Sequence, residues 1–178
     1  MFFIPGFLIA LLTFPGVIVH EIAHRIFCDF AGVPVYKVCY FRVGNPSGYV
    51  VHGQVNNLWS SFLISVGPFL VNSILCSVLG FPPYVNIMLG THLHLVNTLL
   101  IWLSISIGMH AFPSKADLDN FHKNVKSSQG QNMLLVGFSM FLGGCFTIAR
   151  LLSFFWFDLG YALFVGMFMA TMVTFIGT

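Results

Sequence analysis

The chain has 178 residues, of which 57% are hydrophobic and only 7% are charged. A typical soluble domain carries about 25% charged residues, so this composition excludes an ordinary water-soluble protein and indicates a surface that faces lipid. The formal net charge of +2 is too small to indicate nucleic-acid binding. The cysteines are widely spaced and form no CxxC pair, which is typical of buried thiols rather than of a disulfide or metal framework (Cys28, Cys39, Cys76 and Cys145).

Long stretches without formal charge predict about five membrane-spanning helices, because a helix needs roughly 20 apolar residues to cross a bilayer. The first helix is expected over about Phe2–Phe30, with a stop at Gly32-Val33-Pro34. A cleaved signal peptide is the less favoured interpretation of its first part, which has no basic start and no small-residue cleavage site. The next segment, Tyr36–Gly53, contains β-forming residues and the turn sequence Gly-Asn-Pro-Ser-Gly, and predicts a β-hairpin at or near the membrane surface.

The rest of the chain predicts four more spans. The second is expected at about Leu58–Phe81, ending at Pro82-Pro83, and the third at about Tyr84–Ala111. A polar segment, Ser114–Gly130, follows them. The fourth and fifth spans are expected at about 132–154 and 157–176. We therefore predict an all-α polytopic membrane protein with one small hairpin, folded as a single domain over residues 1–178.

The basic residues predict the orientation in the membrane. With five spans, the hairpin and the polar segment lie on the same side as the end of the first helix. Cytoplasmic segments are enriched in Lys and Arg, so we expect this side to be cytoplasmic, the N-terminus outside and the C-terminus inside. The side holds six of the seven basic residues: Arg25, Lys37, Arg42, Lys115, Lys123 and Lys126.

The first predicted helix carries the sequence His20-Glu21-Ile22-Ala23-His24, whose glutamate is the only one in the chain. Residues four apart share a helix face, so His20 and His24 can direct two imidazoles at one zinc ion. Glu21 lies beside them and can take a proton from a metal-bound water. The alternative, three polar residues near a helix end, is costly because ionisable side chains within a span cost roughly 3 kcal/mol each. We expect a zinc site within the bilayer, nearer the cytoplasmic face.

A catalytic zinc site usually has a third protein ligand. A second glutamate is absent from the sequence, and phenylalanines stand at the Gly and His positions of the longer HExxHxxGxxH motif. Among the aspartates, Asp29 lies on a poorly aligned helical face, and Asp158 is expected at the opposite membrane surface. Asp117 and Asp119 remain, just beyond the third predicted span.

This arrangement resembles the site-2 proteases, which are intramembrane zinc metalloproteases. The HEIAH helix, the hairpin, a second span with Gly67-Pro68 and Asn72, and an aspartate after the third span carry the resemblance. It covers about residues 1 to 125 and leaves the spans at 132–154 and 157–176 outside. It implies a three-helix catalytic core, zinc held by two histidines and one aspartate, and cleavage of transmembrane substrates.

The sequence departs from the family pattern at two places. Leu118-Asp119-Asn120 replaces the usual Leu-Asp-Gly, which leaves Asp119 and His110 open as alternatives to Asp117. We prefer Asp117 because it is closer to the membrane, at the start of a short helix expected near Ser114. In the second span, Gly67-Pro68 precedes Asn72 by one residue more than usual.

Two further polar residues are candidates for the catalytic machinery. Asn72 could donate a hydrogen bond to an oxyanion or to the substrate backbone, or equally hold two packed spans together. His110 could orient the site, donate to the transition state, bind the metal, or simply end a span. The hairpin either offers a strand edge to an unwound substrate or packs under the bundle. No catalytic role is expected for His92 and His94, and His52 and His122 are expected to be solvated.

We interpret the chain as an intramembrane zinc metalloprotease in which His20, His24 and Asp117 bind Zn²⁺ and Glu21 acts as general base and then acid. Its expected partners are the bilayer and a membrane-spanning or membrane-proximal substrate, and not nucleic acid. One alternative is a membrane metal-binding or transport protein, which would continue ionisable residues through several spans or show repeated halves. The other is an inactive regulatory homologue, against which the intact Glu21 argues.

Overall fold

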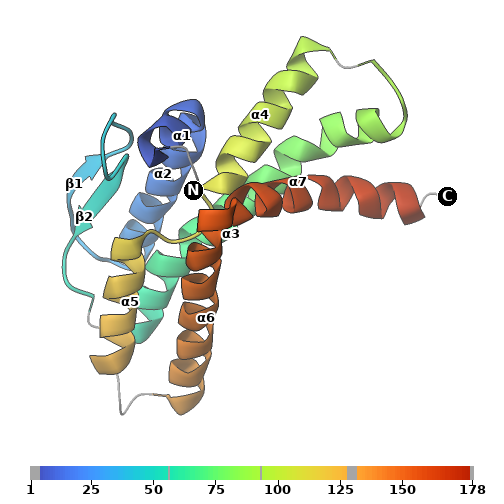
Figure 1. The fold of residues 1–178 in the computed structure, drawn as a ribbon. Helices are drawn as coiled ribbons and strands as arrows, with labels where there is room; N and C mark the ends of the chain where they lie inside the picture. Colours follow the sequence, from blue (N-terminus) through green and yellow to red (C-terminus); the bar gives the residue numbers. More distant parts are fainter. Residues whose placement is uncertain (1–4, 56, 93, 128–131, 177–178) are drawn as a thin grey trace.

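The computed structural model describes residues 5–55, 57–92, 94–127 and 132–176, and Figure 1 shows them as helices with one small sheet. The elements are α1 (Gly6–Leu12), α2 (Phe14–Phe30), β1 (Val35–Cys39), β2 (Tyr49–His52), α3 (Leu58–Met88), α4 (Leu95–Met109), α5 (Lys115–Ser127), α6 (Met133–Leu152), the 3-10 helix η1 (Ser153–Phe155) and α7 (Phe157–Ile176). The strands β1 and β2 pair antiparallel. The mostly helical fold and the hairpin after the first helical segment are therefore confirmed.

Fewer helices than predicted are long and apolar enough to cross a membrane. Among the described residues, α3, α6 together with η1, and α7 meet this condition. The pair α1 and α2 would be a fourth span, but the two helices are bent by 89°. Helix α4 has 15 residues, fewer than the roughly 20 that a span needs. The fourth and fifth predicted segments are confirmed as helices long and apolar enough to cross a membrane, and the number of such helices is three, or four with the bent pair, instead of five.

The first predicted helix is broken at Thr13, which ends α1 and precedes α2. Pro15 lies in the first turn of α2, and a proline has no N–H for a helix that would continue from α1. The break frees the carbonyl of Leu12, which accepts a hydrogen bond from Nε1 of Trp102 on α4 at 3.0 Å. Broken helices are tolerated at membrane depth where neighbouring helices satisfy the freed backbone groups.

The predicted stop at Pro82-Pro83 is wrong, because α3 continues through both prolines to Met88. Pro83 is fully buried among neighbouring helices, and such packing compensates for the lost backbone hydrogen bond. The helix ends instead just before Gly90, whose φ of 67° lies in the left-handed region that favours glycine. The third predicted span therefore starts late, at Leu95.

Small residues bring α3, α4 and α7 close together. A Cβ on Gly80 of α3 would lie 2.7 Å from the carbonyl oxygen of Gly166 on α7. A Cβ on Gly108 of α4 would lie 2.7 Å from the Cβ of Ala162, also on α7. Backbones that approach this closely are typical of helix packing in membranes, where small residues line the interfaces.

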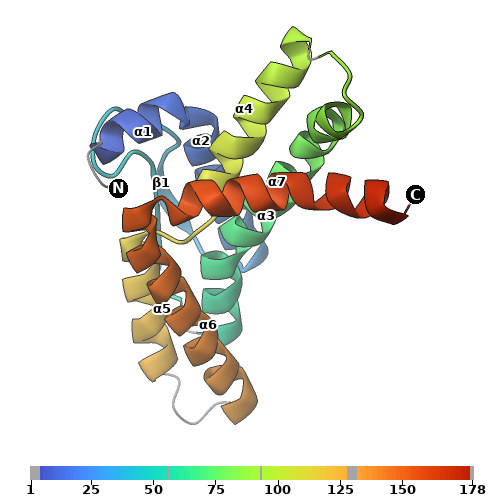
Figure 2. The ribbon, with the colours of Figure 1, turned by 45° about the vertical axis from the view of Figure 1, so that its right-hand side comes forward.

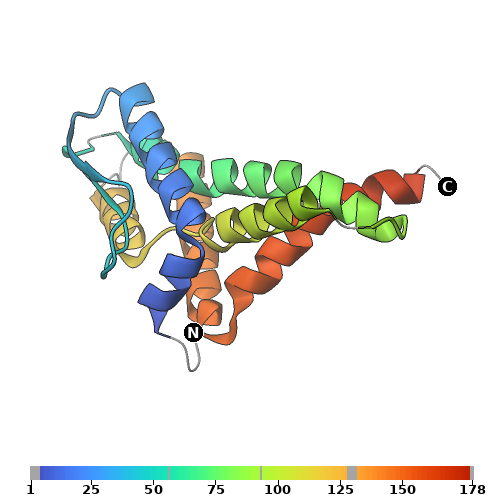
Figure 3. The same ribbon diagram turned by 90° about the horizontal axis from the view of Figure 1, so that it is seen from above.

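The segment predicted to be a polar loop forms α5, which buries Leu118, Phe121 and Val125. Helices α5 and α6 lie side by side and run in opposite directions (Figures 1 and 2). The start of α5 therefore lies near the end of α6. The hairpin lies on the same side of the molecule as α5 (Figures 1 and 3). The cytoplasmic location of that side stays a prediction.

Helices α2 and α4 cross closely at Gly16. A Cβ at this position would overlap the backbone carbonyl of Ser106. Gly16→Ala should therefore push the two helices apart and lower the unfolding free energy by about 1–3 kcal/mol. Thermal unfolding in detergent measures this loss. The matched control is Gly137→Ala in α6, where a Cβ meets nothing within 4 Å. Equal melting temperatures for the two variants would contradict the close crossing.

Candidate metal site and its cavity

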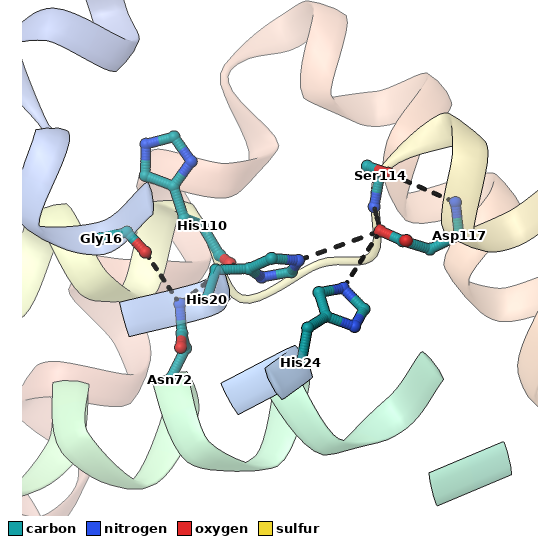
Figure 4. Close-up of polar contacts among 7 residues, drawn as sticks. All are labelled: Gly16, His20, His24, Asn72, His110, Ser114 and Asp117. Atoms are coloured by element: carbon teal, nitrogen blue, oxygen red, sulfur yellow. Dashed lines mark hydrogen bonds and ion pairs between the residues drawn. The ribbon is translucent and has the colours of Figure 1, made fainter. Parts of the chain in front are cut away.

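The three predicted ligands converge from two distant segments. His20 and His24 lie one turn apart on α2, and Asp117 lies in the first turn of α5. The ligand atoms all lie within 4.8 Å of one another (Figure 4). Oδ2 of Asp117 is 3.3 Å from Nε2 of His24 and 3.9 Å from Nε2 of His20. Tetrahedral zinc with bonds of 2.0–2.2 Å separates its ligand atoms by about 3.4 Å, so small side-chain rotations would let the three residues hold one ion.

A backbone contact sets the tautomer of His20. Its Nδ1 lies 2.7 Å from the carbonyl oxygen of His110. Because a carbonyl oxygen only accepts, Nδ1 is the atom that carries the hydrogen. The neutral ring then has its lone pair on Nε2, the nitrogen that faces Asp117. Hydrogen bonds of this kind hold the orientation of metal-ligating histidines.

His24 presents a buried nitrogen that is not satisfied within the described protein. Its Nε2 makes no hydrogen bond among the described residues and lies 3.3 Å from Oδ2 of Asp117. An unsatisfied buried polar atom costs about 1–3 kcal/mol. Coordination of a metal ion would use this nitrogen, so the residues fit the group that the motif implies.

Asp117 is held in place by a capping box at the start of α5. The Ser114 N–H donates to Oδ2 of Asp117 at 2.8 Å, and the Asp117 N–H donates to Oγ of Ser114 at 3.3 Å. Burial raises the pKa of Asp117, but His24 and His20 outweigh it and hold the pKa well below its usual range. The carboxylate is therefore ionised, as a metal ligand must be. The cap alone explains an acidic residue here, but not its position against two histidines.

Glu21 lines the same cavity as the three ligands, a space of about 790 Å³. It is buried, and it makes no hydrogen bond or ion pair with any residue that the structure describes. The hairpin forms one wall of this cavity with Gly44–Tyr49. A Cβ on Gly48 would lie 2.7 Å from Cγ of Glu21. Only glycine therefore lets the hairpin backbone approach the Glu21 carboxylate this closely.

The ring of His110 points away from the three ligands (Figure 4). Its Nε2 lies 2.8 Å from Oγ1 of Thr13, which donates its one hydroxyl hydrogen to Ile9 O. His110 Nε2 is therefore the donor to Thr13. The structure thus brings the backbone of His110, rather than its side chain, into contact with the site, although the residue lines the cavity.

Asn72 lies outside the residues that line the cavity. Its Nδ2, which carries two hydrogens, lies within hydrogen-bond distance of the carbonyl oxygens of His110 (3.0 Å), Ile107 (3.1 Å) and Gly16 (3.4 Å). This geometry corresponds to the interhelical hydrogen bond that the sequence left open beside a direct catalytic role.

The other acidic candidates lie elsewhere. Asp119 is exposed on α5 and is not part of the cluster. Asp29 pairs with Arg25 at 2.9 Å. The expectation that Asp158 lies at the opposite membrane surface is wrong, because it lines the same cavity as Asp117. The antiparallel arrangement of α5 and α6 brings the end of α6, and the residues after it, next to the start of α5 (Figure 2).

Several residues of the site were not found from the sequence. The pattern Ser114-x-x-Asp117 is a readable capping-box signal. Thr13 and Gly48 carry no such signal, because their roles depend on contacts with His110 and Glu21. His52, expected to be solvated, is half-buried and lines the cavity.

Comparisons with protein-family models, with curated proteins and with solved structures each find no match to this chain. The resemblance to the site-2 proteases therefore rests on the residues of the chain alone.

The convergence of the ligands generates the second prediction. Asp117→Asn should lose bound zinc, because an amide is a much poorer ligand than a carboxylate. Asparagine keeps the shape of the side chain and can still accept the Ser114 hydrogen bond. Elemental analysis of protein purified in detergent and dialysed against a chelator makes the comparison. Asp119→Asn is the control and should keep its zinc. If Asp117→Asn holds as much zinc as the wild type, the third ligand lies elsewhere.

Proposed function

We propose that the chain is an intramembrane zinc metalloprotease of the site-2 protease type, which hydrolyses peptide bonds of transmembrane or membrane-proximal substrates. One observation carries the proposal: His20, His24 and Asp117 converge beside Glu21 in one cavity of a chain in which three described helices are long and apolar enough to cross a membrane. A structural ion site would not need, next to its ligands, a carboxylate that makes no hydrogen bond among the described residues.

The residues have separable tasks in peptide hydrolysis. Zinc bound here would polarise the scissile carbonyl and lower the pKa of a bound water to about 7. The Glu21 carboxylate accepts a proton from the attacking water and delivers it to the departing amide nitrogen. His20 is held by the His110 carbonyl, and Asp117 by the Ser114 amide, so the ligands are fixed before the substrate binds.

The cavity suggests how a substrate is held. Its volume of about 790 Å³ lies within the range of roughly 300–1,000 Å³ found for ligand sites. A helical substrate must unwind locally, because its carbonyls are otherwise occupied by helix hydrogen bonds. The hairpin backbone along Gly44–Tyr49 borders the cavity, and we propose that an extended substrate segment lies beside it.

Glu21 separates a protease from a metal carrier that uses the same ligands. A carrier would depend on Glu21 only through its charge near the ion. Glu21→Gln keeps the shape of the side chain but cannot transfer the proton. We expect the variant to keep its fold and its zinc, and to lose proteolysis by about 10² to 10⁴, the usual contribution of general acid–base catalysis.

The assay incubates matched wild-type and Glu21→Gln protein in detergent with membrane-spanning peptides and detects fragments by mass spectrometry. Asp119→Asn, which alters an exposed carboxylate outside the cluster, is the control and should cleave like the wild type. Undiminished cleavage by zinc-loaded Glu21→Gln would remove Glu21 from the mechanism and refute this enzyme class.

A further inference from the structure

Asn72 is fully buried where α2, α3 and α4 meet. Three carbonyl oxygens surround its Nδ2: those of Gly16 on α2, and of Ile107 and His110 at the end of α4. This surrounding fixes the orientation of the amide, because the opposite orientation would place Oδ1 against three acceptors. Oδ1 itself has no hydrogen-bond partner among the described residues. The donor end of the amide therefore accounts for the position of Asn72.

The His110 carbonyl has a second donor in His20. Nδ1 of His20 lies 2.7 Å from this oxygen, and Nδ2 of Asn72 lies 3.0 Å from it. His110 is the C-cap of α4, and the last carbonyls of a helix have no partner within the helix. The oxygen is therefore available to side chains, and its two lone pairs can accept hydrogen bonds from His20 and Asn72.

We propose that Asn72 is a positioning residue for the metal site. It holds the His110 carbonyl against Nδ1 of His20, and thereby keeps Nε2 of His20 directed toward Asp117 and the ion. The inference rests on the proposed zinc site and assigns Asn72 a role through the protein rather than on the substrate. Losing an outer partner of a metal ligand typically costs 10-fold to 100-fold in metal affinity.

A matched pair of variants separates positioning from general helix packing. Asn72→Leu removes the donors and nearly keeps the volume. Ser104→Ala is the control, since Oγ of Ser104 donates to the Cys76 carbonyl at 2.7 Å and so also joins α4 to α3 at a fully buried position. Neither Ser104 nor Cys76 lines the cavity. Both variants should lower the melting temperature.

The readouts are the zinc dissociation constant of the full chain in detergent, from competition with a chelator, and the visible absorption of its Co²⁺ form, which reports ligand geometry. Asn72→Leu should weaken zinc binding by about 10-fold to 100-fold and shift the Co²⁺ spectrum, while Ser104→Ala should change neither. If Asn72→Leu does not fold, Asn72→Ser is measured instead, and a loss in the same direction is expected because serine cannot reach all three carbonyls.

Wild-type affinity and an unchanged Co²⁺ spectrum in the Asn72 variant would overturn the inference. So would an equal loss of zinc in Ser104→Ala, because the effect would then be general destabilisation. These results would leave the proposed function intact. A wild-type chain that binds no zinc would instead overturn the proposed function, and the positioning role with it.

Discussion

The carbonyl oxygen of His110 joins the parts on which the site depends. Helix α4 ends at Met109, so this oxygen has no partner within its own helix and is available to side chains of two others. His20 donates to it from α2 and Asn72 donates to it from α3. The close crossing at Gly16 allows this contact, because any larger residue there would separate α2 from α4. The packing of α2 against α4 therefore also determines the orientation of the His20 ring.

The free-energy cost of placing ionisable side chains within a membrane span explains why these side chains are gathered in one cluster. Charged residues make up only 7% of the chain, and each ionisable side chain within a span costs roughly 3 kcal/mol. His20, Glu21 and His24 are nevertheless buried together on one helix. Asp117 meets them from α5, where a capping box holds its carboxylate. Such a cluster is stable only if its members satisfy one another or a bound ion, and His24 Nε2 makes no hydrogen bond among the described residues.

The features predicted correctly from the sequence are those that depend on residues close together in the chain. The spacing of His20 and His24 gave the shared helix face, and the turn sequence before Tyr49 gave the hairpin. Two prolines were interpreted incorrectly from the sequence. Pro83 was expected to end a helix, but α3 continues through it. Pro15 was not expected to interrupt a helix, but the first helix breaks just before it. Pro83 is fully buried inside α3, whereas Pro15 lies in the first turn of α2, where the missing N–H needs no helix partner. The position of Asp158 also failed, since it depends on how α5 and α6 pair and not on any nearby residue.

X-ray absorption at the zinc edge of the purified full chain tests the ligand set most directly. Coordination by His20, His24 and Asp117 predicts about two imidazole nitrogens at 2.0–2.1 Å, oxygen at about 2.0–2.2 Å, and no sulfur. The buried thiol of Cys28 lies one helical turn beyond His24 on α2 but is not part of the cluster of His20, His24 and Asp117, so no sulfur ligand is expected. A sulfur shell at about 2.3 Å, or oxygen ligands without imidazole, would contradict the account.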